Sequence, residues 1–426
     1  MHETLLDVIL DNDNLNRAYL QVKRNKGSHG VDGMTLEELG KYLVENQETI
    51  IKQIRERKFK PQPVRRVEIP KSNGGVRLLG VPTVVDRVIQ QAIAQVLTPI
   101  FDSRFHENSY GFRPNKNAQN AIVKALEYAN GGNEWIVDID LERFFDTVHH
   151  DRLMNIISRT IKDGDVISLI RKYLVSGIMV DGEYKESIIG TPQGGNLSPL
   201  LSNIMLNELD KELEKRGLKF VRYADDCIIF VKSEMSARRV MRSISEFIEK
   251  KLGLIVNAKK SRIIKPTDKD MKFLGYGFYY DRNDKQIKAK PHDTSIESFK
   301  YRIKELTKRS WGVSMEYRIE KLNQLIRGWV NYFKLGKMKA KLISITQNLR
   351  FRLRMCIWKQ WKTGKKRVKA LIKLGMPAWQ AQRNGNTSKG IARVARSWIM
   401  STTVTNKRLA QKGLVAPDEY YLEVHV

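Results

Sequence analysis

The sequence has 426 residues and a formal net charge of +29, and a chain of this length is expected to form two or three domains. No apolar run approaches the roughly 18 residues that a membrane helix requires, so no membrane span is predicted. The charge is concentrated in residues 301–426, where 28 Lys and Arg stand against 6 Asp and Glu, a net of +22 that leaves +7 for the first 300 residues. This block predicts a polyanionic partner. Nucleic acid is favoured over a membrane surface, because Trp, Tyr, Asn and Gln interrupt the basic stretches.

The two cysteines, Cys227 and Cys356, form no Cys-x-x-Cys pair. We therefore expect neither a zinc site nor a disulfide framework. The first residues, MHETLLDVILDNDN, are acidic where a secretion signal would be basic. These features predict a cytoplasmic protein. The pattern does not indicate an oligomeric state.

The first hundred residues predict helices followed by a hairpin and another helix. Residues 1–60 have apolar side chains at helical spacing. Prolines 61, 63 and 70 require an extended segment after them. The sequence SNGG at 72–75 is typical of a hairpin turn, and a helix is expected near 84–98.

The rest of the chain predicts a mixed body and then a helical extension. A helix is expected over 117–129 and a strand in EWIVDID, while FVRYADDCIIF has the pattern of a buried hairpin with an exposed tip. Another strand is expected in KFLGYGFYY. From about residue 290 the pattern is helical and basic, interrupted by GKKRVK at 364–369, which is expected to be an exposed linker. The fold class predicted is therefore α+β with an α-helical C-terminal part.

The reactive chemistry is expected at three carboxylates. Asp225 and Asp226 occupy the tip of the predicted hairpin, and Asp140 ends the strand WIVDID. A hydrated turn would explain one Asp, but adjacent carboxylates between apolar strands are unfavourable unless a cation compensates them. Oxygen-rich sites suit Mg²⁺. Two such ions can activate an attacking hydroxyl and stabilise a leaving pyrophosphate.

Several motifs, in order between about residues 60 and 280, resemble those of reverse transcriptases. Tyr223-Ala-Asp-Asp226 resembles the Y-x-D-D motif, and Asp140 with an aromatic five residues later, Phe145, resembles the first catalytic motif. The further matching blocks are Lys71 with Arg77, SYGFRP at 109–114, GTPQGG at 190–195 followed by LSP, and FLGYGF at 273–278. Agreement of this many blocks by chance is negligible. The family's fold is the right-hand polymerase, with fingers, palm and a helical thumb.

The resemblance implies a metal-dependent site. Asp140 and Asp225 would be the main ligands of two Mg²⁺ ions, for which Mn²⁺ can substitute. Asp226 would be a weaker ligand, and Leu141 would offer its backbone carbonyl. Asp138 lies on the same strand face as Asp140 by the period-two rule, but a structural role is favoured for it and for Asp146.

The resemblance also implies contacts to an incoming dNTP. Lys71 and Arg77 would neutralise its phosphates, and Gln193 would contact its sugar side. Phe145 would be a steric gate that leaves no room for a 2′-hydroxyl. Lys260 is a candidate proton donor to pyrophosphate, with a plain surface lysine as the alternative.

Two further segments resemble group II intron maturases. They are the N-terminal blocks at 14–18 and 25–33, and LNQLIRGWVNYF at 322–333. In the second block Leu322, Ile326, Trp329 and Phe333 share one helical face, which indicates a thumb core. The residues expected to touch nucleic acid are Arg113, Tyr223, Arg327, Arg350, Arg352, Arg354, Lys359 and Lys362. Trp358 and Trp361, interleaved with the last of these, would suit base stacking.

The resemblance implies four domains and a set of partners. The domains would be an N-terminal extension of the fingers (1–60), fingers and palm (61–285), thumb or maturase domain (286–365) and a basic DNA-binding region (366–426). The partners would be intron RNA and other RNA templates, DNA primer and target, and dNTPs. The chain lacks cysteine pairs of an H-N-H endonuclease, so the short, endonuclease-lacking class typical of group IIC introns is expected, primed at nascent DNA strands.

Two other functions remain open from the sequence. One is a splicing maturase that binds RNA without polymerase activity, against which the intact Asp140, Asp225, Asp226 and Phe145 argue. The other is a retron, diversity-generating or phage-defence enzyme. The maturase block and the N-terminal extension argue against this second alternative.

Overall fold

The computed structural model describes residues 4–70, 74–180, 183–186, 190 and 194–425. The chain divides into two compact units, Met1–Lys265 and Pro266–Val426. Within the described segments, no helix is both long and apolar enough to cross a lipid bilayer. The predicted domain boundaries remain predictions, although the division at 265/266 groups the segment 273–285 with the helices that follow it.

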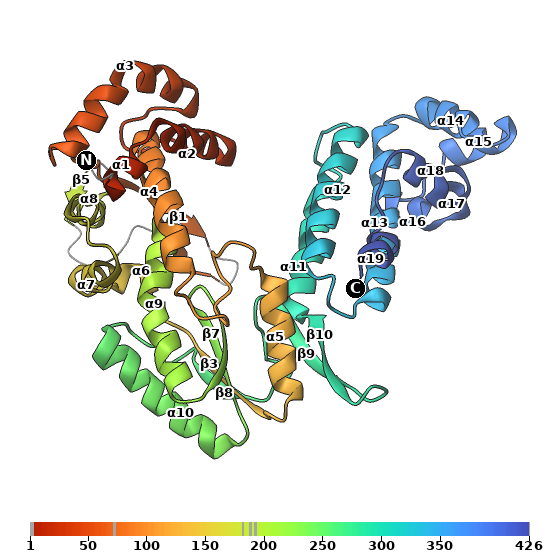
Figure 1. Cartoon of the computed structure of the whole chain (residues 1–426). Coiled ribbons are helices and arrows are strands. Elements are labelled where there is room, and N and C mark those ends of the chain that lie inside the picture. The colour runs from red at the N-terminus through yellow and green to blue at the C-terminus, as the bar shows by residue number, and fades with distance from the viewer. Residues whose placement is uncertain (1–3, 71–73, 181–182, 187–189, 191–193, 426) are drawn as a thin grey trace. The chain divides into compact units, whose positions relative to one another are not determined.

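The first unit is mixed α and β (Figure 1). Its elements in chain order are α1 (Leu5–Ile9), α2 (Asn12–Asn25), α3 (Leu36–Arg55), β1 (Val64–Pro70), β2 (Val76–Val81), α4 (Val84–Asp102), α5 (Ala118–Asn130), β3 (Trp135–Ile139), α6 (Phe144–Thr147), α7 (His150–Thr160), α8 (Gly164–Leu174), β4 (Ile178–Val180), β5 (Glu183–Lys185), α9 (Ser198–Lys215), β6 (Lys219–Tyr223), β7 (Asp226–Val231), α10 (Glu234–Phe247), the π-helical turn η1 (Ile248–Leu252) and β8 (Arg262–Ile264). The predicted α+β class is confirmed.

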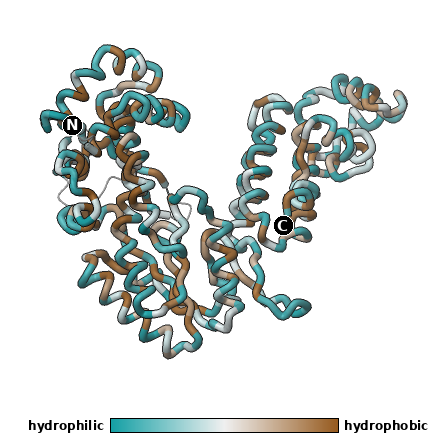
Figure 2. The backbone as a smooth tube through the Cα atoms, viewed as in Figure 1, coloured by the Kyte–Doolittle hydropathy of each residue, from teal (hydrophilic) through white to brown (hydrophobic). Residues whose placement is uncertain are grey.

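The N-terminal part of this unit combines helices with a four-stranded sheet of order β2-β1-β4-β5. Antiparallel pairing from Arg65↔Val81 to Pro70↔Val76 confirms the predicted hairpin. Helix α4 begins after Thr83, whose side chain accepts a hydrogen bond from the Asp86 amide, the usual role of an N-cap threonine. Hydrophobic residues are frequent along α4 (Figure 2), which belongs to the core of this unit.

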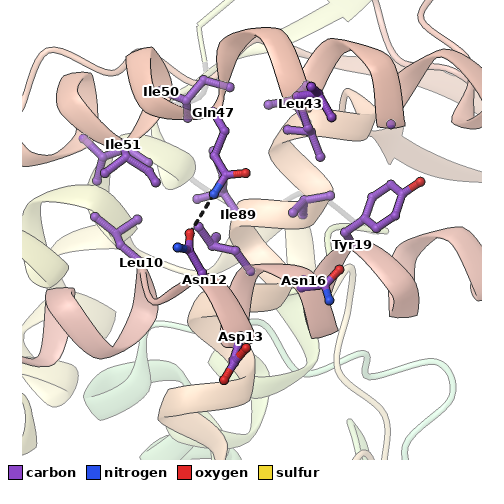
Figure 3. A pocket seen from close by; sticks show the side chains of 16 residues that line it. Leu10, Asn12, Asp13, Asn16, Tyr19, Leu43, Gln47, Ile50, Ile51 and Ile89 are labelled. Carbon is purple, nitrogen blue, oxygen red and sulfur yellow. Dashed lines mark hydrogen bonds between the residues drawn. The ribbon is translucent and has the colours of Figure 1, made fainter.

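Helices α2, α3 and α4 enclose a cavity of about 710 Å³ (Figure 3). Leu43, Ile50 and Ile89 are among its apolar walls. A hydrogen bond of 2.9 Å from Gln47 Nε2 to Asn12 Oδ1 ties α3 to α2 beside it. The cavity lies in the predicted extension of the fingers.

The second sheet has the order β6-β7-β3-β8 and is antiparallel throughout. Val137, Ile139 and Ile229 belong to the core formed with α9 and α10. On the other face, Phe230 contacts Tyr128 of α5 with ring centroids 5.7 Å apart. Because successive strand residues alternate between faces, β3 and β7 have one apolar face towards α9 and α10 and a second face that carries the acidic residues.

The second unit is a two-stranded sheet followed by helices. Its elements are β9 (Tyr276–Asp281), β10 (Gln286–Pro291), α11 (Asp293–Leu306), α12 (Met315–Tyr332), α13 (Lys339–Gln360), α14 (Gly364–Lys373), α15 (Ala378–Gly385), α16 (Ile391–Arg396), α17 (Trp398–Thr403), α18 (Asn406–Gln411) and α19 (Pro417–Val424). In α12, Leu322, Ile326 and Phe333 are buried, and Trp329 stacks on Phe299 of α11 at 4.3 Å. The prediction that this stripe forms a core is confirmed.

The expected linker at 364–369 is wrong, because these residues begin helix α14. Thr363 caps the helix by accepting a hydrogen bond from the Lys366 amide. Leu371 is fully buried, and Val368 lies against Gly385 of α15 so closely that a side chain there would collide with it. Two apolar residues at helical spacing therefore outweigh the cations beside them, which remain exposed to solvent.

Candidate active site

Strand register brings the three predicted carboxylates to one end of the second sheet. Asp138 pairs with Ile228, and Ile139 pairs with Cys227, so Asp140 follows opposite Asp226. The hairpin of β6 and β7 closes at Tyr223↔Asp226. The prediction that Asp140 lies beside the 225–226 tip is therefore confirmed, and alternation places Asp138, Asp140 and Asp226 on the same face.

The carboxylates disturb one another electrostatically. Burial, followed by the charges of Asp225, Asp138 and Asp140, raises the pKa of Asp226 to about 7, although its side chain reaches solvent. Burial and then Asp140 raise the pKa of Asp225, while Arg77 and Arg222 oppose the shift. Such mutual repulsion is relieved by a proton or by a cation.

The backbone of Asp140 is fixed by the segment before β8. Its amide donates to Ser261 Oγ at 3.0 Å, and its carbonyl accepts from the Asn257 amide at 2.8 Å. The Lys260 ammonium lies 3.5 Å from Asp140 Oδ2, but this buried oxygen has no hydrogen bond. Leu141 forms an isolated bridge with Val256, which leaves the chain extended on both sides of the carboxylate.

The donor set fits a divalent cation, although it has not closed around one. Among the described residues, no three His, Cys, Asp or Glu side chains already stand close enough together to hold a metal ion. Asp140, Asp225 and Asp226 nevertheless supply hard oxygen ligands, one of them a buried oxygen without a hydrogen bond. Lys260 provides positive charge beside that oxygen, which is where a cation is electrostatically favoured.

The hairpin tip is held by Arg222, a fully buried residue that sequence reasoning missed. Its Nε and Nη2 donate to the two carboxylate oxygens of Asp210 at 2.7 and 2.5 Å. Nη1 donates to Asn203 Oδ1 at 3.1 Å and to the Ala224 carbonyl at 2.8 Å, and Nη2 also donates to Ser109 Oγ at 2.8 Å. All five guanidinium N–H groups are therefore used, and one of them fixes the turn that carries Asp225.

The turn itself requires this support. Ala224 has φ +57°, a left-handed conformation that is unfavourable for a residue with a side chain. Gly111 packs against the Ala224 backbone so closely that any side chain at position 111 would collide with it. Residues 108–111 also run beside β6, since the Tyr110 amide donates to the Arg222 carbonyl at 2.9 Å. The SYGFRP block thus supports the tip from outside the sheet.

A signal for this network was present in the sequence. Arg222 is a charged residue within an apolar strand, on the same face as Phe220, which is a position that requires a buried partner. Asp210 continues the spacing of Leu206, Leu209 and Leu213 on the buried face of α9. An acid and a base that both interrupt apolar patterns are candidates for a buried pair.

The nucleotide-contact candidates are only partly described. Lys71 and Gln193 lie outside the described residues. Arg77 is close enough to Asp225 to lower its pKa. Phe145 is half-buried and contacts Phe144 edge-on, with centroids 5.2 Å apart.

The backbone around Phe145 is closely packed. Gly190, with φ +100°, lies against the Phe145 carbonyl with little room for a side chain. His150 Nε2 is 2.5 Å from the Gly190 carbonyl, so this histidine has a structural contact. Asp138 accepts a hydrogen bond of 3.0 Å from Arg262 Nε, which supports the structural role expected for it.

The structure gives two predicted nucleic-acid contacts in the first unit structural positions. Arg113 was expected to touch nucleic acid, but its side chain is only 6% exposed. Its guanidinium donates to Asp102 Oδ1 at 2.6 Å and to backbone carbonyls that include Ser109, so it anchors the SYGFRP block instead. Tyr223 is half-buried in the hairpin.

The candidates in the second unit differ in how freely they reach solvent. Arg327, Lys359 and Lys362 are exposed. Arg350 pairs with Glu419 at 2.7 Å, and Arg354 donates to the Val404 carbonyl and to Asn406. Contact of all these residues with nucleic acid remains a prediction.

The stacking role expected for Trp358 is wrong. Its ring is 1% exposed and lies under the guanidinium of Arg367, 4.9 Å from the ring centroid. Trp361 lies 5.7 Å from it, centroid to centroid. Trp358 belongs to the core of the second unit because α14 covers it, and periodicity within α13 does not show that contact.

An antiparallel sheet that carries acidic residues at a fixed hairpin tip, with helices on both faces, is the palm of a template-directed polymerase. The sequence comparisons specify the class. Residues 69–278 match the family model "Reverse transcriptase (RNA-dependent DNA polymerase)", and residues 296–375 match "Group II intron, maturase-specific domain".

Relatives among curated proteins agree with these models. Protein YkfC of Escherichia coli is 32% identical over 314 residues, which cover 64% of this chain and 82% of that protein. The group II intron-encoded protein LtrA of Lactococcus lactis is 32% identical over 324 residues, which cover 61% of this chain and 54% of LtrA. Among solved structures, telomerase from Candida albicans matches 87% of this chain and 68% of its own, with 15% identity and a TM-score of 0.45.

The chain belongs to the reverse transcriptases of the group II intron maturase type. Its fold is the α+β right-hand class of that family, and nucleic acid is its partner class. Reverse transcriptases of this family work with divalent metal ions. The chain spans most of YkfC but only about half of LtrA.

Proposed function

We propose that this protein copies RNA into DNA at the end of the second sheet, with Asp140 and Asp225 as the main ligands of two Mg²⁺ ions. The observation that carries the proposal is the register that sets Asp140 opposite the 225–226 tip while Asp140 Oδ2 is left buried without a hydrogen bond. Asp226 would contribute as a weaker ligand and Leu141 through its carbonyl. When bound, such a pair of ions activates the attacking 3′-hydroxyl and stabilises the leaving pyrophosphate.

The chain's own residues would orient and select the nucleotide. Arg77, together with Lys71, would neutralise the phosphates of the incoming dNTP. Phe145 would exclude a 2′-hydroxyl, and Gln193 would contact the sugar side. Lys260 would donate a proton to pyrophosphate, a role that its 3.5 Å distance from Asp140 Oδ2 supports.

The second unit would hold structured RNA. Residues 266–426 contain 35 Lys and Arg against 12 Asp and Glu, a net of +23, and a basic surface of this kind favours a phosphate backbone. Intron RNA during splicing and the template strand during copying are the proposed ligands. Target DNA at residues 366–426 and a cytoplasmic setting belong to the same proposal.

A splicing maturase without polymerase activity is the alternative function. The Arg222–Asp210 network argues against it, because a protein that only binds RNA has no need to fix the turn of Asp225 so completely. Splicing of the intron at low Mg²⁺, with and without protein, measures the maturase activity separately.

Primer extension on poly(rA)/oligo(dT) with Mg²⁺ tests the polymerase proposal. We expect Asp225→Ala to lower the rate by about 1,000-fold or more, which corresponds to roughly 4 kcal/mol of lost transition-state stabilisation. The same variant should bind Mn²⁺ more weakly in an electron paramagnetic resonance titration. Asp138→Asn is the matched control, and it should retain activity within about tenfold, or 1.4 kcal/mol. Wild-type protein that extends no primer under these conditions would support the alternative.

A further inference from the structure

A basic pocket lies within the second unit, away from the carboxylates of the sheet. Its volume is about 640 Å³, within the roughly 300–1,000 Å³ range of pockets that hold small ligands. The lining residues are Lys308, Arg309, Ser310, Arg352, Met355, Lys359 and Ile391. They come from the turn after α11, from one face of α13 and from the start of α16. Four of them are cations, and none is a carboxylate.

Arg352 is fixed in this pocket without being neutralised. Its Nε donates to Thr307 Oγ1 at 2.6 Å, and its Nη2 donates to the carbonyls of Lys304 at 3.1 Å and Thr307 at 3.4 Å. Thr307 is itself fully buried and donates to the Ile303 carbonyl at 2.6 Å. The acceptors at the end of α11 thus orient the guanidinium but cancel none of its charge.

The cations beside Arg352 also keep most of their charge. Lys308 pairs with Glu305 at 2.5 Å. No ion pair joins Arg309 or Lys359 to an acidic side chain in the part of the chain that the structure describes, and both are exposed. Burial, and then the charge of Arg309, lower the pKa of Arg352, as expected for like charges held together. Packing of Arg309, Arg352 and Lys359 around one cavity is unfavourable until an anion enters.

We propose that the Arg309–Arg352–Lys359 pocket binds the phosphodiester backbone of RNA, engaging one or two adjacent phosphates. A planar guanidinium held in place offers its free N–H groups to phosphate oxygens, and the two exposed cations can close from either side. Met355 and Ile391 give the pocket an apolar wall, which a sugar edge can contact. The proposal rests on the proposed function and adds to it the place where one stretch of RNA is gripped.

RNA is favoured over a free phosphate ion or DNA for two reasons. All the lining residues except Ile391 lie in 296–375, the segment that matches the maturase-specific model. The cavity is also larger than one phosphate ion requires, so a nucleotide unit can enter with its phosphate. Phosphate, as the shared chemistry, then identifies the site as a backbone contact that does not read base sequence.

The test compares two double variants of the full chain. Arg309→Ala with Lys359→Ala removes two pocket charges, whereas Lys366→Ala with Lys373→Ala removes two exposed charges of α14 outside the pocket. Binding of a fluorescein-labelled RNA hairpin is measured by anisotropy over a KCl series. We expect the pocket variant to lose about 0.7–0.9 of the slope of log K against log salt per phosphate released, while the control keeps the wild-type slope. Equal slopes for the two variants would overturn the proposal.

Further arms identify the ligand. A DNA hairpin of the same sequence should lose less affinity than RNA in the pocket variant, and inorganic phosphate should not displace RNA from the wild type. An equal loss for DNA, or displacement by phosphate, would overturn the assignment to RNA. Lys359→Ala alone, at an exposed position, repeats the test with little risk to folding. Primer extension at saturating template should be unchanged in the pocket variant, so failure of polymerisation in the wild type is separated from failure of this site.

Discussion

The two units satisfy their buried arginines in different ways. In the first unit Arg222 donates to both oxygens of Asp210, and Arg113 donates to Asp102. In the second unit Arg318, which is 1% exposed, donates to the backbone carbonyls of Leu306, Lys308 and Trp311. No carboxylate pairs with Arg318 within the segments that the structure describes.

The difference concerns what remains after the hydrogen bonds are made. A carboxylate orients an arginine and cancels its charge, whereas a carbonyl at a helix end orients it and leaves the charge in place. Unit 1 carries a net of +6 and unit 2 a net of +23. The first arrangement suits a site where metal ligands must stand in a controlled field, and the second suits a surface that holds a polyanion.

The largest expected effect compares Arg222→Met with Arg318→Met. Arg222→Met leaves Asp210 as a buried carboxylate without a cation, which costs about 3–5 kcal/mol of folding free energy. Arg318→Met leaves only carbonyls without donors, which costs about 1–3 kcal/mol. Urea unfolding of the full chain, followed by circular dichroism, measures both. Equal losses would show that the two anchoring modes do not differ energetically.

A control for the first variant removes both partners. Arg222→Met combined with Asp210→Leu should recover part of the loss, because no charge then remains unpaired. Recovered stability without recovered primer extension would separate the positioning of the Asp225 turn from folding. A double variant as unstable as Arg222→Met would instead mean that Asn203 and Ser109 carry the stabilisation.

The next effect tests a buried acid of unit 1 that departs from the rule. Asp86 accepts hydrogen bonds from Thr83, Gln62 and Tyr173, but no cation pairs with it among the described residues. Burial raises the pKa of Asp86 to about 6, from 3.8.

The sign follows from this raised pKa. The folded state holds the proton more tightly than the unfolded chain, so the stability from this proton is complete below about pH 4. It is lost as the pH rises towards 6, by up to roughly 3 kcal/mol at 1.36 kcal/mol per pKa unit. Asp86→Asn should flatten that part of the curve in urea unfolding measured from about pH 4 to 7. A variant curve parallel to the wild type would assign the pH dependence to other groups.

The smallest effect concerns nucleotide selection, which the comparison assigns to unit 1 alone. Phe145→Ala should lower discrimination between dNTP and NTP by about 10–200-fold, the range for loss of one steric or apolar contact. Single-nucleotide incorporation kinetics measure the ratio. Phe144→Leu is the neighbouring control, since Phe144 is buried and should affect stability more than selection. RNA affinity and its salt dependence should not change with Phe145→Ala. Unaltered discrimination would show that another side chain is the gate.

The sequence by itself determined the local elements and the order of the motifs. Alternating and helical spacing, with Gly, Pro and Asn at the turns, predicted the β1–β2 and β6–β7 hairpins and the core stripe of α12, because these patterns depend on neighbours within a few residues. The position of Asp140 beside Asp225 and Asp226 was also predictable, since three acids in apolar strands have few ways to share a cation.

Tertiary structure decided which charged and aromatic residues remain available. Arg113, Arg222 and Trp358 look alike in the sequence to residues that could touch nucleic acid, yet each is buried by a segment remote from its own helix or strand. The same holds for α14, whose cations suggested a linker until α15 covered its apolar face. The physical reason is that burial and charge pairing depend on contacts between distant segments, which local periodicity does not encode.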